Sequence, residues 1–322
     1  DVSETDPEEP TDPPTMSNTL GSEMMPPDYP VTVPAGTVEF VPAGEHRFGM
    51  VVIEGMMIIE DDADITARGI HVSKAGVLKI GNEDGRMKNV SIKFVGERDN
   101  LNDPFHWYPG LTINGRCDLF GSLVGPEGET YPSANEIKQI ARRSKTDWRR
   151  FPTYTKDPNA WEITTDWGQK ITAGDCNLSR GITIRGDHIA FLHHGHYHFD
   201  GVRSKDAPGT AIGKLDKTKQ VLAHKTQQGQ NNAGRYNFHA HHNHHGEHSV
   251  LKNCVADGGK KWGFTLHESS NSRWKNNLAF NIEGAGFMRE GTGAENMAFE
   301  DSVAVCITGD LNVSDRNSGG RA

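Results

Sequence analysis

The sequence predicts an all-β protein: a right-handed parallel β-helix, preceded by a glycine-rich β domain that stacks on it. Short apolar runs separated by Gly follow one another through much of the 322-residue chain. In addition, the segment 250–305 nearly repeats itself at an offset of 23 residues. A repeat of this length is typical of a solenoid, and short β-type runs in place of paired helices indicate a parallel β-helix.

Residues 1–30 are an acidic, proline-rich segment, which we interpret as a tail or linker. They carry eight acidic residues and no Lys or Arg, so most of the formal net charge of −9 belongs to them. The rest of the chain is close to neutral and has only one short basic cluster, at 142–150. Nucleic-acid binding is therefore not expected, and neither is membrane insertion, because no apolar run reaches the length of a membrane span.

Residues 31–180 are predicted to form the glycine-rich β domain, with a long insertion near 97–160. Apolar and polar residues alternate at 70–72 and 77–80, and Gly stands at nearly every bend, as in strands joined by tight turns. Within the insertion, residues 133–146 are a helix candidate, because Ser133 and Glu136 can form a capping box.

Residues 181–322 are predicted to form the parallel β-helix. Strands of successive coils stack about 4.7–4.9 Å apart, so residues one repeat apart become neighbours. The motif F-x-x-H at 238–241 and 264–267, continued as F-x-x-E at 287–290, then predicts an outward row of His241, His267 and Glu290. His239 should share this face, because it stands two residues before His241.

Histidine is concentrated in the same region. Of the 16 His, 13 lie between His188 and His267. The four Cys are widely spaced and form no CxxC motif, which argues against a zinc ribbon or a thioredoxin-type site. Their pairing cannot be derived from the sequence.

Several short motifs resemble the cell-migration-inducing and transmembrane hyaluronidase family, which is related to fibrocystin. GRYNFHAHH at 234–242, GFTLHES at 263–269, GFMREG at 286–291, FEDSVAV at 299–305 and LNVSDRNS at 311–318 are similar to its β-helix. Upstream, VPAGTVEF, IEGMMII and GVLKIG resemble the domain named for its eight glycines, and LSRGITIRGD resembles the strand that enters the helix. The resemblance implies a hyaluronan-like acidic polysaccharide as substrate and an extracellular or cell-surface location.

The chain departs from the family pattern in three places. It has about 20 additional polar residues at 211–233, and more histidines follow its HAH motif than in the family. It also ends at Ala322, where family members continue with further coils. We therefore expect a C-terminal remainder of the same precursor as a separate chain, because an open β-helix end exposes unpaired strands.

The histidine row predicts a divalent metal site. Imidazoles and one carboxylate on a rigid surface suit Zn, Cu, Mn or Fe, and Ca is not distinguished from them. Two alternatives stay open: a functional row without metal, and a purely structural one. The predicted metal ligands are His194, His239, His241, His267 and Glu290.

The predicted reaction is cleavage of the polysaccharide by a hydrolase or a lyase. Hydrolysis needs two carboxylates, for which Glu290 with Glu268 or Asp257 are candidates, whereas a lyase needs a base such as His241 or His267. We predict His241, His267 and Glu290 as catalytic residues. The predicted substrate-binding residues are Arg235, Tyr236, Lys260, Lys261, Trp262 and Arg289. The alternative function is a non-catalytic, glycan-binding or structural β-helix module of a cell-surface assembly.

Overall fold

The computed structural model describes most of the strand-forming part of the chain. The described residues are 30–96, 109–125, 176–186, 188–207, 235–244, 249–259, 261–291 and 296–307, with the short strands at 15–16, 162–164 and 170–172. The helix expected at 133–146 and most of the acidic segment lie outside them.

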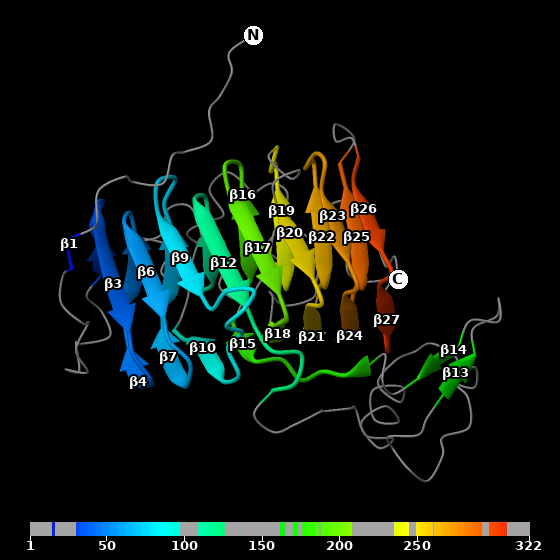
Figure 1. Cartoon of the computed structure of the whole chain (residues 1–322). Helices are drawn as coiled ribbons and strands as arrows, with labels where there is room; N and C mark the ends of the chain where they lie inside the picture. Colours follow the sequence, from blue (N-terminus) through cyan, green and yellow to red (C-terminus); the bar gives the residue numbers. More distant parts are fainter. Residues whose placement is uncertain are drawn as a thin grey trace.

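The body is a solenoid of three parallel sheets, here called A, B and C (Figure 1). Sheet A consists of β1 (Thr15–Met16), β3 (Thr37–Val41), β6 (Met56–Ile59), β9 (Val77–Ile80), β12 (Arg116–Phe120), β17 (His196–Asp200), β20 (Val250–Lys252), β23 (Arg273–Lys275) and β26 (Ala298–Glu300). Sheet B consists of β2 (Val31–Val33), β5 (Met50–Ile53), β8 (Gly69–Val72), β11 (Leu111–Ile113), β16 (Ile189–Leu192), β19 (Phe238–His241), β22 (Phe264–His267) and β25 (Phe287–Glu290).

Sheet C completes each coil. It consists of β4 (Gly44–Arg47), β7 (Ala63–Ala67), β10 (Val90–Phe94), β15 (Ile182–Arg185), β18 (Val202–Ala207), β21 (Val255–Gly259), β24 (Leu278–Ile282) and β27 (Val303–Val305). The strands β13 (Glu162–Thr164) and β14 (Lys170–Thr172) form a separate antiparallel pair.

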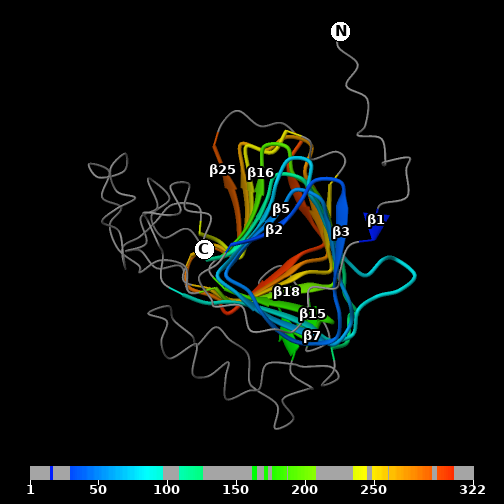
Figure 2. The same cartoon turned by 90° about the vertical axis from the view of Figure 1, so that its left-hand side faces the viewer.

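The chain passes from sheet B to sheet A to sheet C and then begins the next coil. Seen from the N-terminal end in Figure 2, this path runs clockwise as the chain moves away from the viewer. The predicted all-β class and right-handed parallel β-helix are therefore confirmed. The same three sheets continue from the glycine-rich part into the β-helical part, so the glycine-rich part stacks on the helix as expected.

The stacking register agrees with the 23-residue offset read from the sequence. β22 pairs with β25 so that Phe264 faces Phe287 and His267 faces Glu290. β21 pairs with β24 in the same way, placing Ala256 beside Ala279.

The interior of the solenoid is filled by aromatic and aliphatic rows. Phe238, Phe264 and Phe287 stack with centroid distances of 4.9 and 5.0 Å between neighbouring rings. Trp274 is fully buried, and its indole Nε1 donates to the Tyr197 hydroxyl at 2.9 Å. Each coil is stabilised by the packing of its apolar side chains against those of the neighbouring coils.

Glycine is needed where one coil approaches the backbone of the preceding coil. A Cβ on Gly76 would lie 2.0 Å from the carbonyl oxygen of Ile53, and one on Gly115 would lie 2.1 Å from that of Ser73. No side chain fits at such distances, which explains why Gly recurs at these bends.

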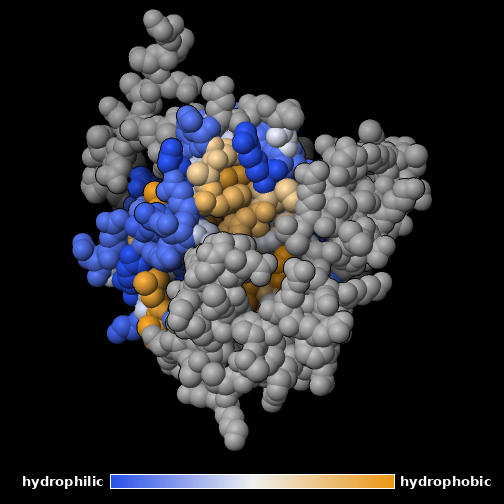
Figure 3. All heavy atoms as spheres, turned by 90° about the vertical axis from the view of Figure 1, so that its right-hand side faces the viewer, coloured by the Kyte–Doolittle hydropathy of each residue, from blue (hydrophilic) through white to orange (hydrophobic). Residues whose placement is uncertain are grey.

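Two further features concern the surface and the thiols. Figure 3, which faces the C-terminal end of the solenoid, shows an apolar area among the described residues. The partly buried Phe287, Phe299 and Ile307 pack against the core. The four Cys are buried free thiols, and burial raises the pKa of Cys254 to about 12.

Among the described residues, no helix is long and apolar enough to span a membrane.

Candidate functional site

A cluster of histidines lies on the outer surface of sheet B. On β19 and β22, Phe238, Ala240, Phe264 and Leu266 are fully buried in the core. Because side chains alternate along a strand, the residues between them point outward. His241, His267 and Glu290 stand opposite one another on β19, β22 and β25, as the sequence predicts.

The side chains of this row are in direct contact. His241 Nδ1 lies 3.0 Å from His267 Nδ1, and His267 Nδ1 lies 3.6 Å from Glu290 Oε2. A hydrogen bond between two imidazole nitrogens requires that one is protonated and the other is not. The pair therefore shares one proton, and Glu290 stands close enough to stabilise it when it lies on His267.

His239 extends the cluster into a buried position. It lies on the same face as His241, but its side chain is only 3% exposed, and its ring stacks parallel to that of His267 with a centroid distance of 5.9 Å. One potential ligand atom each from His239, His241 and His267 lies within 4.8 Å of the other two. They form one of two groups in the described part of the chain that could hold a metal ion.

A second trio shares His267 with two residues at the ends of the strands. His242 Nδ1 lies 3.3 Å from Glu268 Oε2, and these residues can also present ligand atoms together with His267. Both adopt left-handed backbone conformations, with φ of 50° for His242 and 44° for Glu268. In the next coil the corresponding residue is Gly291, with φ of 86°.

Eleven described residues other than Gly have a positive φ, and all but His242, Glu268 and Cys306 are Asn or Asp. The left-handed conformation costs a residue with a Cβ roughly 1–2 kcal/mol, and such strain tends to be retained at functional positions. His242 is not among the metal ligands or catalytic residues predicted from the sequence. The doublets His241-His242 and His267-Glu268 at equivalent positions of two coils were the signal available for it.

The coil before β19 contributes His193 in addition to the expected His194. The His193 ring lies 6.2 Å from that of His241 and 5.8 Å from that of His242. His194 is exposed in the turn after β16, and its backbone N–H donates to Asn114 Oδ1 at 3.4 Å. Its role as a ligand stays a prediction.

The aromatic residues expected to bind sugar form a buried cluster beside the histidines. Tyr236 and Trp262 are each 2% exposed and stack with ring centroids 4.7 Å apart. Tyr236 also packs edge-on against His239, with a centroid distance of 4.8 Å. In this structure they support the wall behind His239, and their predicted contact with substrate is not tested.

The basic residues expected to bind substrate are spread over different environments. Arg235 is 3% exposed and its guanidinium donates to His188 Nδ1 at 2.6 Å. The buried Lys261 places its ammonium 5.8 Å from the centre of the Tyr236 ring. Arg289 stands opposite the core residue Leu266 and so points to the other side of β25 from Glu290. Lys260 lies outside the described residues.

Of the two carboxylates considered as partners of Glu290, only Glu268 lies in the cluster. Asp257 is on β21 in sheet C, where it forms a two-point ion pair with Arg203. Within the described residues, the carboxylates that contact the histidine cluster are therefore Glu268 and Glu290.

Two family models match the chain. The model of the G8 domain matches residues 20–124, and the model of the CEMIP beta-helix matches residues 215–320. No curated protein and no solved structure matches the chain. The second match contains His239, His241, His267 and Glu290, and the first contains the glycine-rich coils that precede them.

Proposed function

Because the chain belongs to the family that joins a G8 domain to a CEMIP-type β-helix, a pairing typical of extracellular and cell-surface proteins, we propose that it cleaves an acidic polysaccharide outside the cell. The observation that carries the proposal is the contact of His241 with His267 and of His267 with Glu290 on an outer sheet face. A proton-sharing pair of imidazoles beside a carboxylate is suited to general acid–base catalysis.

A divalent metal ion fits the donor set. Two imidazole nitrogens that bind one tetrahedral zinc at about 2.0–2.1 Å lie about 3.3 Å apart. His241 Nδ1 and His267 Nδ1 are 3.0 Å apart, and His239 supplies a third imidazole in reach. His239, His241 and His267 would hold the ion. When bound, it would supply Lewis-acid chemistry toward a carboxylate or a water molecule.

The residues of the chain have distinct tasks in this proposal. Without the ion, His241 and His267 hold or move one proton, since their Nδ1 atoms face each other; with the ion, the same two Nδ1 atoms would be its ligands. Glu290 orients His267 from the next coil, and Glu268 does the same for His242. Buried Tyr236 and Trp262 fix the position of His239 from behind.

Two reaction routes remain within the proposal. A hydrolase would use Glu290 and Glu268 as the pair of carboxylates, and it would add water across the broken glycosidic bond. A lyase would use His241 or His267 to remove the proton next to the uronate carboxyl group. The glycosidic C–O bond on the neighbouring ring carbon breaks, the leaving oxygen takes up a proton, and the uronate product carries a double bond. The ultraviolet absorbance of an unsaturated uronate separates the two routes.

The proposal is tested with the full chain and defined polysaccharides. Hyaluronan, chondroitin and alginate are incubated with the protein and sized, while the metal content is measured by elemental analysis. We expect shortened chains, a decrease in rate of about 10²-fold or more in His241→Ala and His267→Ala, and loss of bound metal in both. His196→Ala, which removes a histidine from sheet A, is the matched control.

The outcomes are distinct. If the protein binds a polysaccharide but shortens none of the three, the non-catalytic binding module is the correct function. If the variants lose cleavage while the wild-type protein carries no metal, the row acts without metal, as an acid–base site.

A further inference from the structure

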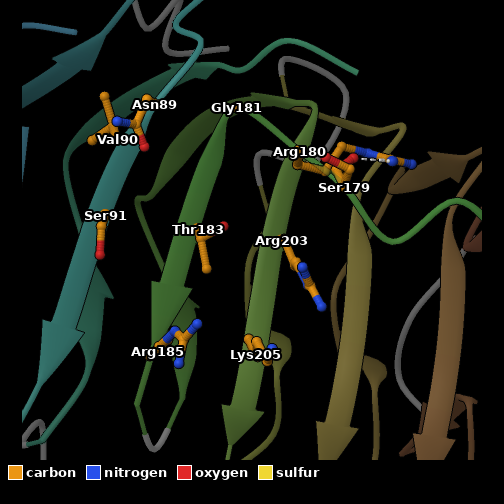
Figure 4. Close-up of a pocket in the computed structure, with 10 residues that line it drawn as sticks. All are labelled: Asn89, Val90, Ser91, Ser179, Arg180, Gly181, Thr183, Arg185, Arg203 and Lys205. Carbon is orange, nitrogen blue, oxygen red and sulfur yellow. Dashed lines mark hydrogen bonds between the residues drawn. The ribbon is translucent and has the colours of Figure 1, made fainter. Parts of the chain in front are cut away.

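A separate, positively charged hollow lies on sheet C, away from the histidine cluster on sheet B. Figure 4 shows it over β10, β15 and β18, with Ser179 and Arg180 at one end of the strands and Arg185 and Lys205 side by side near the other. Four of its lining residues are basic and none is acidic. They are Arg180, Arg185, Arg203 and Lys205.

The hollow is small, with a volume of about 190 Å³. Pockets that enclose a whole small-molecule ligand usually measure about 300–1,000 Å³. This hollow therefore fits one anionic group together with part of a sugar ring, and a longer ligand would extend beyond it along the surface.

The basic side chains form a row along the axis of the solenoid. On β10 and β15 the residues at 92 and 184 are in the core, so Lys93 and Arg185 point outward. Lys93, Arg185 and Lys205 stand opposite one another on consecutive strands. With about 4.7–4.9 Å between strands, the row from Lys93 to Lys205 is about 9.5 Å long.

The charges of this row are only partly neutralised by the protein. Asp257 on β21 stands opposite Lys205, but its carboxylate is paired with Arg203. Arg185 lies 3.9 Å from Asp206 in an exposed pair. In the described part of the chain, Lys93 and Lys205 form no ion pair.

Arg180 adds a charge at the end of the hollow. Its guanidinium donates to three backbone carbonyl groups, those of Asn253, Asn177 and Ser179, and it has no ion pair in the described residues. Backbone carbonyls hold the side chain in place but leave its net charge uncompensated, so the hollow keeps an attraction for anions.

A second outward row sets the limits of the site. It begins with the acidic Glu45 and Asp64 on β4 and β7 and continues with Ser91 and Thr183. The acidic groups repel an anion at the N-terminal end, whereas the hydroxyl groups over β10 and β15 can bond to sugar oxygens.

We propose that the hollow and the basic row on β10, β15 and β18 bind a carboxylate or sulfate group of an acidic polysaccharide whose chain runs along the solenoid axis. This site is separate from the histidine cluster and does not depend on its activity. Nucleic acid is the less suitable polyanion, because the described lining offers hydroxyl groups and no aromatic ring for base stacking.

The test compares two double variants that remove the same charge. Arg185→Ala with Lys205→Ala removes the row, and Arg116→Ala with Lys275→Ala removes two exposed cations from sheet A. All proteins carry His241→Ala, so that the polysaccharide stays intact and failure of the proposed cleavage does not affect the result. Binding of hyaluronan and chondroitin sulfate oligosaccharides is measured by calorimetry at low and physiological salt.

We expect the row variant to bind about tenfold more weakly than the control, with a smaller loss of affinity on addition of salt. An equal decrease in both double variants would indicate attraction by net charge alone and overturn the site. Absence of binding by the parent protein would also overturn it. Equal affinity for single-stranded DNA would overturn the assignment to polysaccharide.

Discussion

Acid should destabilise the glycine-rich part of the solenoid through His71. This residue is on β8, 6% exposed, with its Nδ1 3.1 Å from the Thr112 hydroxyl oxygen. Burial lowers the pKa of His71 from 6.5 to about 4. The folded protein thus favours the neutral ring, and the contribution to stability is complete above pH 6.5 and is lost as the pH falls toward 4.

The size of the effect follows from the same shift. At about 1.36 kcal/mol per pH unit, the difference between 6.5 and 4 corresponds to at most about 3 kcal/mol. His71→Gln keeps a polar group next to Thr112 but cannot be protonated, so its unfolding free energy should fall less between pH 7 and pH 4. Urea unfolding followed by tryptophan fluorescence over this pH range measures it.

The control for this experiment is Thr112→Val, which removes the hydrogen-bonding partner and keeps the imidazole. It should be less stable at every pH and retain the acid-dependent decrease. If His71→Gln shows the same decrease as the wild-type protein, another group is responsible and the reasoning about His71 is refuted.

Two further predictions concern a strained residue and a buried charge. Glu268→Gly should leave the unfolding free energy unchanged or raise it by up to about 1 kcal/mol, because Gly accepts φ of 44° without strain. The same substitution should decrease polysaccharide cleavage. A clear loss of stability in urea unfolding would contradict the first expectation. Asp200 is 1% exposed; burial favours its neutral form, but Arg86, Asn253 and Lys252 outweigh this and lower its pKa. Asp200→Asn should therefore cost about 3 kcal/mol at neutral pH and less at pH 3, and a cost independent of pH would argue against an ionised carboxylate.

The outer row of the site could be predicted from the sequence because residues one repeat apart in a solenoid lie next to each other on neighbouring strands. His267 and Glu290 are 23 residues apart in a segment where several other positions repeat at the same spacing, and in the structure they face each other. His241 is 26 residues before His267 and so does not fit the 23-residue offset; its position opposite His267 was predicted from the F-x-x-H motif that both strands share. In both cases the strand alternation then fixed which side chains point outward.

Burial on the outer face could not be predicted in the same way. Alternation correctly places His239 on the outside of sheet B, but it does not reveal that the residue is 3% exposed. Tyr236 and Trp262 were assigned to substrate because aromatic rings can stack on sugars; in the structure they are buried and pack against each other, and their contact with substrate stays a prediction. The turn geometry of His242 is a backbone property that strand alternation does not reveal, and residues other than Gly are uncommon at left-handed positions.

Sheets A and C also differ in how far their neighbouring like charges are neutralised. Like charges placed directly opposite each other on neighbouring strands destabilise a sheet. On sheet A, Lys252 and Lys275 are such neighbours, but each has a carboxylate within 3.4 Å, from Asp200 and Asp301 respectively. On sheet C, Lys93, Arg185 and Lys205 are aligned, and the next residue of the row, Asp257, is already paired with Arg203. Arg185 has only the exposed Asp206 at 3.9 Å among the described residues. A row of cations that the fold leaves this weakly compensated is stabilised best by an anion from outside, and this is the physical basis for assigning it to a polyanionic ligand.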